Sequence, residues 1–207
     1  MNFLTNKIAF PNVSEATADG LLAIGGDLST KRLLHAYQNG IFPWFEDQEP
    51  ILWWSPDPRF VIHPKDLKVS KSMKRLLKKD VFKITKNKAF DLVMQNCAKV
   101  NRKDQHGTWI TNEMVNAYTQ MHKLGYAVSV EVWQNEELVG GLYGVDLGNN
   151  VFCGESMFAK VSNASKAGFI TFVQQSNYKL IDCQLHTNHL ESLGGSYISR
   201  DDFLKYL

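Results

Sequence analysis

The chain has 207 residues, of which 44% are hydrophobic and 12% aromatic, and this suffices for a packed core in one large domain or two small ones. No stretch approaches the roughly 18 apolar residues of a membrane span, and the N-terminus lacks the features of a signal peptide. We therefore expect a cytoplasmic protein with no membrane partner. Cys97, Cys153 and Cys183 are far apart in the sequence, and His186 and His189 have no evident third ligand. We therefore expect no metal site. No cofactor is expected either.

The first sixty residues are rich in glycine, proline and tryptophan. Ser29 can cap a helix that continues to Gln38 and stops at Gly40. Gly25-Gly26 lacks the flanking pattern of a phosphate-binding loop, so we expect a turn there. An extended backbone at Trp53-Trp54 would point the two indoles in opposite directions, where an indole can either stack a base or pack in a seam between domains.

Positive charge is concentrated between Lys65 and Lys103, where thirteen Lys or Arg residues stand against three acidic ones. Ser70 can cap a helix in this segment. The expected helix has an apolar face and, opposite it, a basic stripe formed by Lys71, Lys74, Arg75 and Lys78. Such a stripe is often only a solvated surface, but an excess of ten charges in under forty residues equally suits a polyanion-binding surface.

The middle of the chain predicts a helix followed by a hairpin. The helix begins at Thr111 and stops at Gly125, and the alternating segment Ala127–Trp133 follows as a strand. A two-residue turn at Asn135-Glu136 leads to a return strand over Leu138–Leu147. Three glycines in that return strand leave space for another group to approach the backbone.

Two short acidic motifs lie at the ends of predicted neighbouring strands, one containing Glu155 and the other Asp182. Between them, Ser162 or Asn163 can cap a helix. Because a helical crossover returns the chain in the same direction, both strand ends should open on one edge of the sheet. Ligands usually bind at that edge in α/β sheets. Each acid alone could be merely solvated, but the pair predicts a site.

The predicted order of elements resembles acyltransferases of the N-acetyltransferase superfamily. This resemblance implies an α+β fold: an N-acetyltransferase-like domain over residues 63–207, with a mixed sheet flanked by helices, and a small N-terminal α/β domain over residues 1–62. Those enzymes hold the pyrophosphate of coenzyme A in a glycine-rich loop. Met157–Lys166 occupies that position without the glycines. We therefore expect no coenzyme A, and instead a larger polyanionic acyl carrier suited to the basic segment.

Short motifs spread over nearly the whole chain resemble the bacterial leucyl/phenylalanyl-tRNA–protein transferases. They occur in the order of that family: Gly20-Leu21-Leu22-Ala23, Gly40-Ile41-Phe42-Pro43-Trp44, Trp53-Trp54-Ser55-Pro56, Gly107-Thr108-Trp109-Ile110, Ser129-Val130-Glu131-Val132-Trp133, Gly140-Gly141-Leu142-Tyr143-Gly144, Gly154-Glu155-Ser156-Met157-Phe158, Asn163-Ala164-Ser165-Lys166 and Asp182-Cys183-Gln184. One departure is Val128, where the family more often has histidine.

The resemblance implies an aminoacyltransferase that moves leucine or phenylalanine, and methionine less well, from aminoacyl-tRNA to proteins. The acceptor would be an N-terminal arginine or lysine, and the product would be marked for N-degron proteolysis. An aminoacyl ester is already activated, so the enzyme must mainly align the amine with the carbonyl and manage one proton. No covalent enzyme intermediate is required.

The resemblance also implies roles for individual residues. Asp182 would polarise the amide of Gln184, whose oxygen would accept a proton from the attacking amine, with Cys183 pointing into the core. Glu155 would pair with the cationic side chain of the acceptor. Trp53 would stack the terminal adenosine of the tRNA, and the basic stripe would hold its phosphates. The substrate-binding residues would be Trp53, Trp54, Tyr143, Ser156, Met157, Phe158, Phe169, Ile170 and Phe172.

Three other functions stay open from the residues alone. A small-molecule acyl-CoA transferase would need the missing glycine loop. A peptide ligase would share the aminoacyl-tRNA donor but use a different acceptor. An RNA-binding module would need the basic stripe without the acidic and amide residues.

Overall fold

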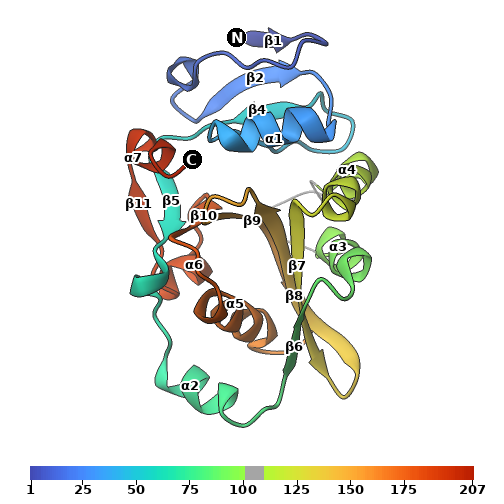
Figure 1. Ribbon diagram of the computed structural model, residues 1–207, viewed down its shortest axis with the longest axis vertical. Helices are drawn as coiled ribbons and strands as arrows, with labels where there is room; N and C mark the ends of the chain where they lie inside the picture. The colour runs from blue at the N-terminus through green and yellow to red at the C-terminus, as the bar shows by residue number, and fades with distance from the viewer. Residues whose placement is uncertain (101–109) are drawn as a thin grey trace.

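The computed structural model describes residues 1–100 and 110–207, which form two sheets (Figure 1). The smaller sheet has the order β1-β2-β4-β3. Its strands are β1 (Asn2–Leu4), β2 (Leu21–Gly25), β3 (Phe42–Pro43) and β4 (Leu52–Trp54). Helix α1 (Thr30–Gln38) lies beside this sheet and begins where the Ser29 side chain accepts a hydrogen bond from the backbone N–H of Arg32, as the sequence predicts.

The larger sheet has the order β11-β5-β10-β9-β8-β7-β6. All neighbouring pairs are antiparallel except β9 and β10, so the sheet is mixed. Its strands are β5 (Arg59–Ile62), β6 (Lys83–Lys86), β7 (Ala127–Gln134), β8 (Glu137–Asp146), β9 (Val151–Ala159), β10 (Leu180–Gln184) and β11 (Ser196–Ile198). This mixed sheet, flanked by helices, confirms the α+β prediction. Strand β5 belongs to the larger sheet although it precedes residue 63; the division into two domains stays a prediction.

Helices cover both faces of the larger sheet. Helix α5 (Ala164–Gln175) packs on β7, β8 and β9 from one side, while α3 (Phe90–Ala98) and α4 (Asn112–Lys123) lie together on the other (Figure 1). The remaining helices are α2 (Lys71–Leu77), α6 (Asn188–Ser192) and α7 (Arg200–Leu204), with short 3-10 turns at Val13–Glu15 and Pro64–Asp66. None of the helices in the described ranges is long and apolar enough to cross a membrane.

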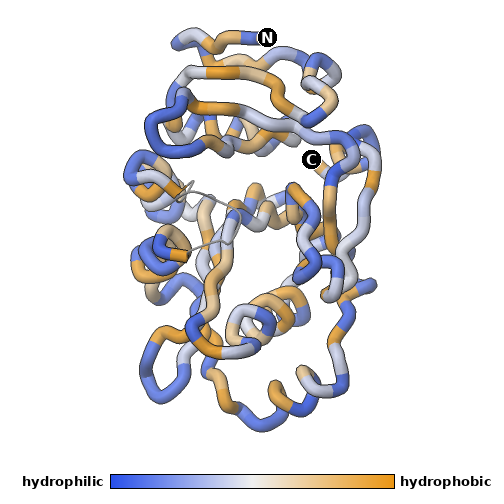
Figure 2. Tube along the Cα trace, turned by 180° about the vertical axis from the view of Figure 1, so that it is seen from behind, coloured by the Kyte–Doolittle hydropathy of each residue, from blue (hydrophilic) through white to orange (hydrophobic). Residues whose placement is uncertain are grey.

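The helices and the hairpin of the middle segment match their sequence signals. Thr111 caps α4 through the N–H of Met114, and α4 is followed by Gly125 in a left-handed conformation. Asn135 and Glu136 both have positive φ, as a two-residue hairpin turn requires. The Ser70 side chain caps α2 by accepting a hydrogen bond from the backbone N–H of Met73, as expected. Hydrophobic and hydrophilic residues are interspersed along the chain trace (Figure 2).

The Ser129–Trp133 motif has a structural role. Glu131 is fully buried in β7 and accepts hydrogen bonds from the hydroxyls of Thr85 (2.5 Å) and Ser129 (2.6 Å). It also accepts hydrogen bonds from the backbone N–H groups of Lys88 and Ala89, both at 3.2 Å. Because Ala89 offers no side-chain cap, Glu131 satisfies the backbone where α3 begins.

Glu131→Ala is expected to lower the free energy of unfolding by about 3 kcal/mol, since it leaves several buried donors without an acceptor. Denaturant unfolding measures this. Glu137→Ala, at an exposed position in the same hairpin, should change stability by less than about 0.5 kcal/mol. Equal effects of the two substitutions would show that the Glu131 hydrogen bonds do not stabilise the fold.

Candidate active site

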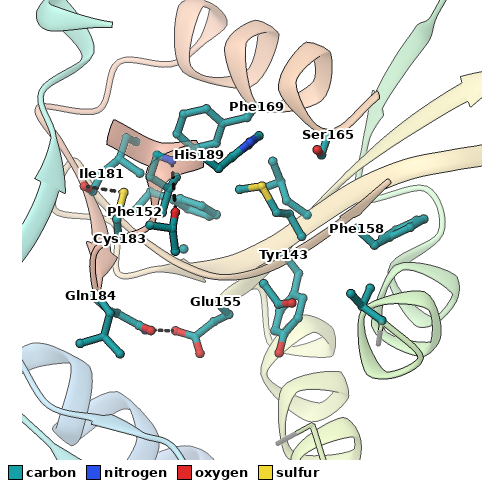
Figure 3. A pocket seen from close by; sticks show the side chains of 18 of the residues that line it. Tyr143, Phe152, Glu155, Phe158, Ser165, Phe169, Ile181, Cys183, Gln184 and His189 are labelled. Atoms are coloured by element: carbon teal, nitrogen blue, oxygen red, sulfur yellow. Dashed lines mark hydrogen bonds between the residues drawn. The ribbon is translucent and has the colours of Figure 1, made fainter. Parts of the chain in front are cut away.

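A cavity of about 480 Å³ lies where β10 separates from β9 (Figure 3). The two strands pair at only three positions, Leu180 with Val151, Ile181 with Phe152 and Asp182 with Cys153, and β9 then continues along β8 alone. The lining is mostly apolar and includes Phe42, Pro43, Trp44, Leu142, Tyr143, Phe152, Gly154, Glu155, Ser156, Met157, Phe158, Ser165, Phe169, Ile181, Cys183, Gln184, Leu185, Thr187, His189 and Leu190. Its volume is in the range of small-molecule binding sites.

Two irregularities in the strands turn Glu155 and Gln184 towards each other. Tyr143 pairs with Ser156 and Gly144 pairs with Gly154, so Glu155 is the extra residue of a bulge in β9. In β10, Asp182 and Gln184 pair with consecutive residues of β5, so Cys183 is the extra residue there. Glu155 therefore lies within β9 and not at its end, which corrects the sequence prediction. The predicted parallel arrangement of β9 and β10 is confirmed.

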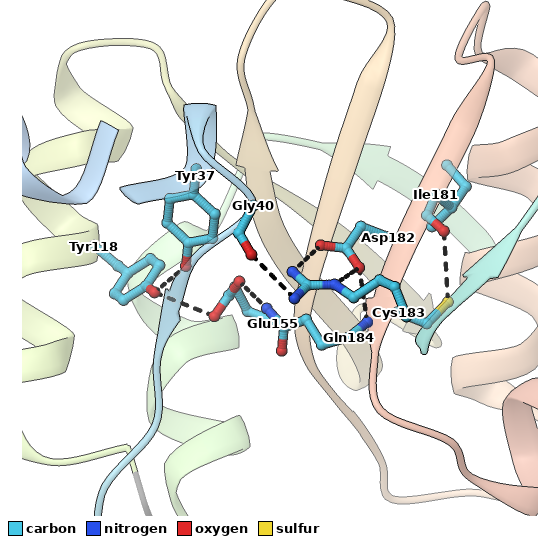
Figure 4. Close-up of polar contacts among 9 residues, drawn as sticks. Tyr37, Gly40, Tyr118, Glu155, Ile181, Asp182, Cys183 and Gln184 are labelled. Atoms are coloured by element: carbon cyan, nitrogen blue, oxygen red, sulfur yellow. Dashed lines mark hydrogen bonds and ion pairs between the residues drawn. The ribbon is translucent and has the colours of Figure 1, made fainter. Parts of the chain in front are cut away.

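A chain of hydrogen bonds runs from Gln184 to the N-terminal part of the molecule (Figure 4). Gln184 Nε2 donates to Glu155 Oε1 at 2.7 Å, and the hydroxyl of Tyr118 donates to Glu155 Oε2 at 3.1 Å. Tyr118 is also hydrogen-bonded to the hydroxyl of Tyr37 in α1. Burial, followed by the charge of Glu155, raises the pKa of both tyrosines well above its ordinary value, so both remain protonated donors. The chain thus joins α1, α4, β9 and β10 around one carboxyl group.

Glu155 is a carboxyl group tuned to titrate near neutral pH. Burial raises its pKa from an ordinary value of 4.5 to about 7, even though hydrogen bonds from Tyr37, Tyr118 and Gln184 act in the opposite direction. The nearby charge of Asp182 adds to the increase. A carboxylate that is costly to ionise and faces a cavity has a strong reason to take up a cationic partner.

The raised pKa predicts that stability falls as pH rises. Between the unfolded pKa of 4.5 and the folded value of about 7, the folded protein retains a proton that the unfolded chain has lost. Glu155 should therefore lower the free energy of unfolding by about 3 kcal/mol between pH 4 and pH 8. Glu155→Gln removes this contribution, so the variant should be more stable than the native chain at pH 8 but not at pH 4. Unfolding curves at both pH values test this, and equal differences at both would contradict it.

The side-chain amide of Gln184 is hydrogen-bonded to Glu155 and not to Asp182, which corrects the sequence prediction. Asp182 is fully buried and forms a two-point ion pair with Arg59, at 2.8 Å from Nε to Oδ1 and 2.7 Å from Nη2 to Oδ2. Its Oδ1 also accepts the backbone N–H of Gln184 at 2.9 Å. Simple alternation would place Asp182 and Gln184 on one face, but the bulge at Cys183 and the positive φ of Gln184 (62°) break it. Cys183 lines the cavity instead of pointing only into the core.

Five of the nine residues predicted to bind substrate line the cavity, and four do not. Tyr143, Ser156, Met157, Phe158 and Phe169 lie on its walls. Two of the four exceptions lie in α5: Ile170 is fully buried in the core, and the ring of Phe172 packs 4.7 Å from that of Phe152. The face of α5 that meets the cavity carries Ser165 and Phe169, which are one helical turn apart (Figure 3).

Neither tryptophan of the Trp53-Trp54 pair lines the cavity. Trp53 is fully buried, and its Nε1 donates to the carbonyl of Gly25 at 2.8 Å, so stacking on a tRNA base is excluded for this conformation. Trp54 is half-buried and donates from Nε1 to the carbonyl of Trp44 at 2.6 Å. Trp44, which was not among the predicted site residues, lines the cavity, and its ring lies 5.6 Å from that of Trp54.

The basic stripe consists of three residues of α2 and of Lys78, which caps the C-terminal end of this helix. All four of its residues are exposed, while Met73 on the opposite face is buried. The last residues of the basic segment, Arg102 and Lys103, and the start of the Gly107–Ile110 motif lie outside the described residues. His186 pairs with Glu191 at 3.0 Å, whereas His189 lines the cavity. Within the described ranges, no group of three or more metal-ligating side chains is found.

Comparison with known proteins gives consistent matches over the chain. A family model described as leucyl/phenylalanyl-tRNA protein transferase matches residues 61–207, and the model of its N-terminal domain matches residues 26–57. The transferase of that name from Flavobacterium psychrophilum is 60% identical, with 100% of this chain and 99% of the relative covered. The one from Flavobacterium johnsoniae is 57% identical at the same coverage. A solved GCN5-related N-acetyltransferase from Kribbella flavida aligns over 80% of this chain and 59% of its own, at 9% identity and a TM-score of 0.41.

Proposed function

The chain belongs to the leucyl/phenylalanyl-tRNA–protein transferase family, and on this basis we propose that it moves leucine or phenylalanine, and methionine less well, from aminoacyl-tRNA to the N-terminal arginine or lysine of acceptor proteins. It is an aminoacyltransferase by family. The acceptor preference, the cytoplasmic location and the marking of products for N-degron proteolysis are parts of the proposal.

One observation carries the proposal: the hydrogen-bonded pair Glu155–Gln184 lies at one end of an apolar cavity (Figure 3). An aminoacyl ester brings its own leaving group, so the protein needs to hold an apolar side chain next to a group that aligns an amine. The cavity offers the first and the Gln184 amide offers the second.

In the proposed reaction, the α-amine of the acceptor attacks the ester carbonyl, the bond from the carbonyl carbon to the ribose oxygen breaks, and the amine proton ends on that oxygen. Because Gln184 Nε2 donates to Glu155, the amide oxygen of Gln184 is oriented to accept an N–H of the attacking amine. Asp182 serves this step indirectly, by holding the backbone N–H of Gln184.

Glu155 is proposed to read the acceptor side chain. An ionised carboxylate has four lone-pair positions, and Tyr37, Tyr118 and Gln184 use at most three of them, which leaves capacity for a guanidinium or ammonium group. An acceptor with a neutral side chain would leave the carboxylate unpaired, and this costs binding free energy.

The donor is proposed to lie with its side chain among Met157, Phe158 and Phe169. Such an apolar wall separates side chains by only about 1–3 kcal/mol per methylene, so acceptance of methionine is expected. Trp44, in place of the buried Trp53, offers its partly exposed ring to the terminal adenosine. The exposed stripe on α2 would hold tRNA phosphates, with affinity that falls steeply as salt rises.

The direct test is transfer of labelled leucine from leucyl-tRNA to two peptides that differ only in an N-terminal arginine or alanine. The proposal predicts labelling of the arginine peptide alone. Labelling of neither peptide, despite salt-sensitive tRNA binding, would favour an RNA-binding module or a ligase with another acceptor. Stabilisation of the protein by coenzyme A in a thermal-shift assay would contradict the expected carrier.

A further inference from the structure

Arg59 is a fully buried arginine held on all sides by groups from distant parts of the chain. Its guanidinium lies 4.7 Å from the ring centroid of Phe42 and 4.7 Å from that of Phe203. Its Nη1 donates to the carbonyl of Gly40 at 3.2 Å, and its Nε and Nη2 donate to the carboxylate of Asp182. A planar, bidentate and stacked arrangement of this kind suits arginine and not lysine.

The contacts continue from Arg59 to the proposed reactive amide. Asp182 Oδ1 accepts from Arg59 Nε and from the backbone N–H of Gln184 (Figure 4). Gln184 has a left-handed backbone, with φ of 62°, a conformation that is uncommon for residues other than glycine. The hydrogen bond to Asp182 is a local contact that holds this conformation, so Arg59 acts on Gln184 through one carboxylate.

Arg59 also lies behind the wall of the cavity. Phe42, one of the two rings that enclose it, lines the cavity, whereas Arg59 itself does not. The other ring, Phe203, belongs to α7 near the C-terminus. Arg59 therefore joins the β3 segment and α7 to the strand that carries Gln184.

We propose that Arg59 is a positioning residue for aminoacyl transfer: by fixing Asp182 against β3 and α7, it sets the backbone of Gln184 and hence the direction of its amide. The inference rests on the proposed function of Gln184. A buried ion pair need not stabilise a fold, because the cost of desolvating both charges can offset their attraction. The buried Arg59–Asp182 pair therefore need not stabilise the fold in order to serve the protein, because it can act by orienting Gln184.

The test compares Arg59→Met/Asp182→Asn with Arg32→Met/Asp27→Asn. The first double variant removes both charges together, so no unpaired buried charge opposes folding. The second is a matched control, since Arg32 is the other fully buried arginine with an aspartate partner in the described ranges, and it contacts the backbone of Thr5 and Lys7, away from the cavity.

In the Arg59 double variant, kcat for leucine transfer is expected to fall about 10²-fold while KM for leucyl-tRNA stays within about twofold, since a displacement of roughly 1 Å at the reacting groups has an effect of this size. The single variant Arg59→Lys, with Asp182 intact, should also have a lowered kcat, because an ammonium group cannot form the two parallel hydrogen bonds of a guanidinium. The control should keep the native kcat. A folded Arg59 double variant with native kcat would overturn the inference without touching the proposed function, whereas a native chain that transfers nothing would reject the proposed function.

A second readout does not depend on activity. Amide hydrogen exchange over residues 182–186 should speed up about tenfold or more in the Arg59 double variant and stay unchanged in the Arg32 control, because only the first removes the guanidinium that fixes the side chain of residue 182 against the Gln184 N–H. Unchanged exchange in both would overturn the inference even if transfer is never observed.

Discussion

Gln184→Ala is expected to slow the transfer of leucine to an arginine peptide by about 10²–10⁴-fold, the range typical for loss of a group that handles a proton in the transition state. The side-chain amide of Gln184 lies 2.7 Å from Glu155 and lines the cavity. The backbone of Gln184 is held separately, by the hydrogen bond from its N–H to Asp182. Alanine therefore removes the amide and keeps the backbone contacts. Single-turnover rates with saturating leucyl-tRNA measure the loss.

The matched control is Gln120→Ala, which removes an exposed glutamine of α4. It should leave the transfer rate within about twofold of the native value. The affinity for leucyl-tRNA should be unchanged in both variants, because the amide is proposed to act on the amine and not on the donor. A Gln184→Ala rate within tenfold of native would remove the amide from the mechanism.

Glu155→Gln is expected to abolish the preference for a cationic acceptor. The amide oxygen introduced by this substitution can still accept from Gln184 Nε2, so the geometry of the pair is retained while the charge is lost. Loss of one partner of a buried charge pair costs about 2–5 kcal/mol, so transfer to an arginine peptide should fall by roughly 10²–10³-fold. Transfer to a methionine peptide should change little, and the ratio of kcat/KM values for the two peptides measures the preference.

Glu137→Gln serves as the control for this substitution, since it removes the charge of an exposed glutamate outside the cavity. It should retain the native ratio. A Glu155→Gln enzyme that still prefers the arginine peptide would assign acceptor recognition to another group. The same variant should be more stable than the native chain at pH 8, so a loss of selectivity cannot be ascribed to unfolding.

The sequence predicts the regular parts of the fold because their signals are local. Ser29, Ser70 and Thr111 each begin a helix as expected, and Asn135-Glu136 forms the expected hairpin turn. Helix α3 and strand β6 were not predicted, since both lie in a lysine-rich segment whose charge is its most prominent signal.

The candidate site was predicted in part. The helical crossover between β9 and β10 predicts that Glu155 lies near the end of β10. In the structure Glu155 lies 2.7 Å from the side-chain amide of Gln184. The direction of Asp182 could not be predicted, because a bulge and a left-handed residue leave no mark in an alternating strand pattern. The partner of Asp182 is 123 residues away, and no local pattern links the two.

Three further residues of the site had weak or ambiguous signals. Tyr37 and Tyr118 occupy inward positions of predicted helices, where a tyrosine usually indicates core packing, and only their contact with Glu155 reveals a polar role. Trp44 had no signal of its own: alternation indicates that the adjacent indoles of Trp53 and Trp54 point in opposite directions, but not that Trp53 is the buried one.

The most direct test of the proposed acceptor site compares two peptides, one beginning with arginine and the other with citrulline, which has nearly the same shape without the charge. Both are offered to the native enzyme with leucyl-tRNA, and the rates of leucine attachment to the α-amine are measured. An ionised Glu155 that reads the acceptor predicts a preference for arginine of roughly 10²–10³-fold. Equal rates for the two peptides would contradict the proposed arrangement of Glu155 and Gln184 around the acceptor.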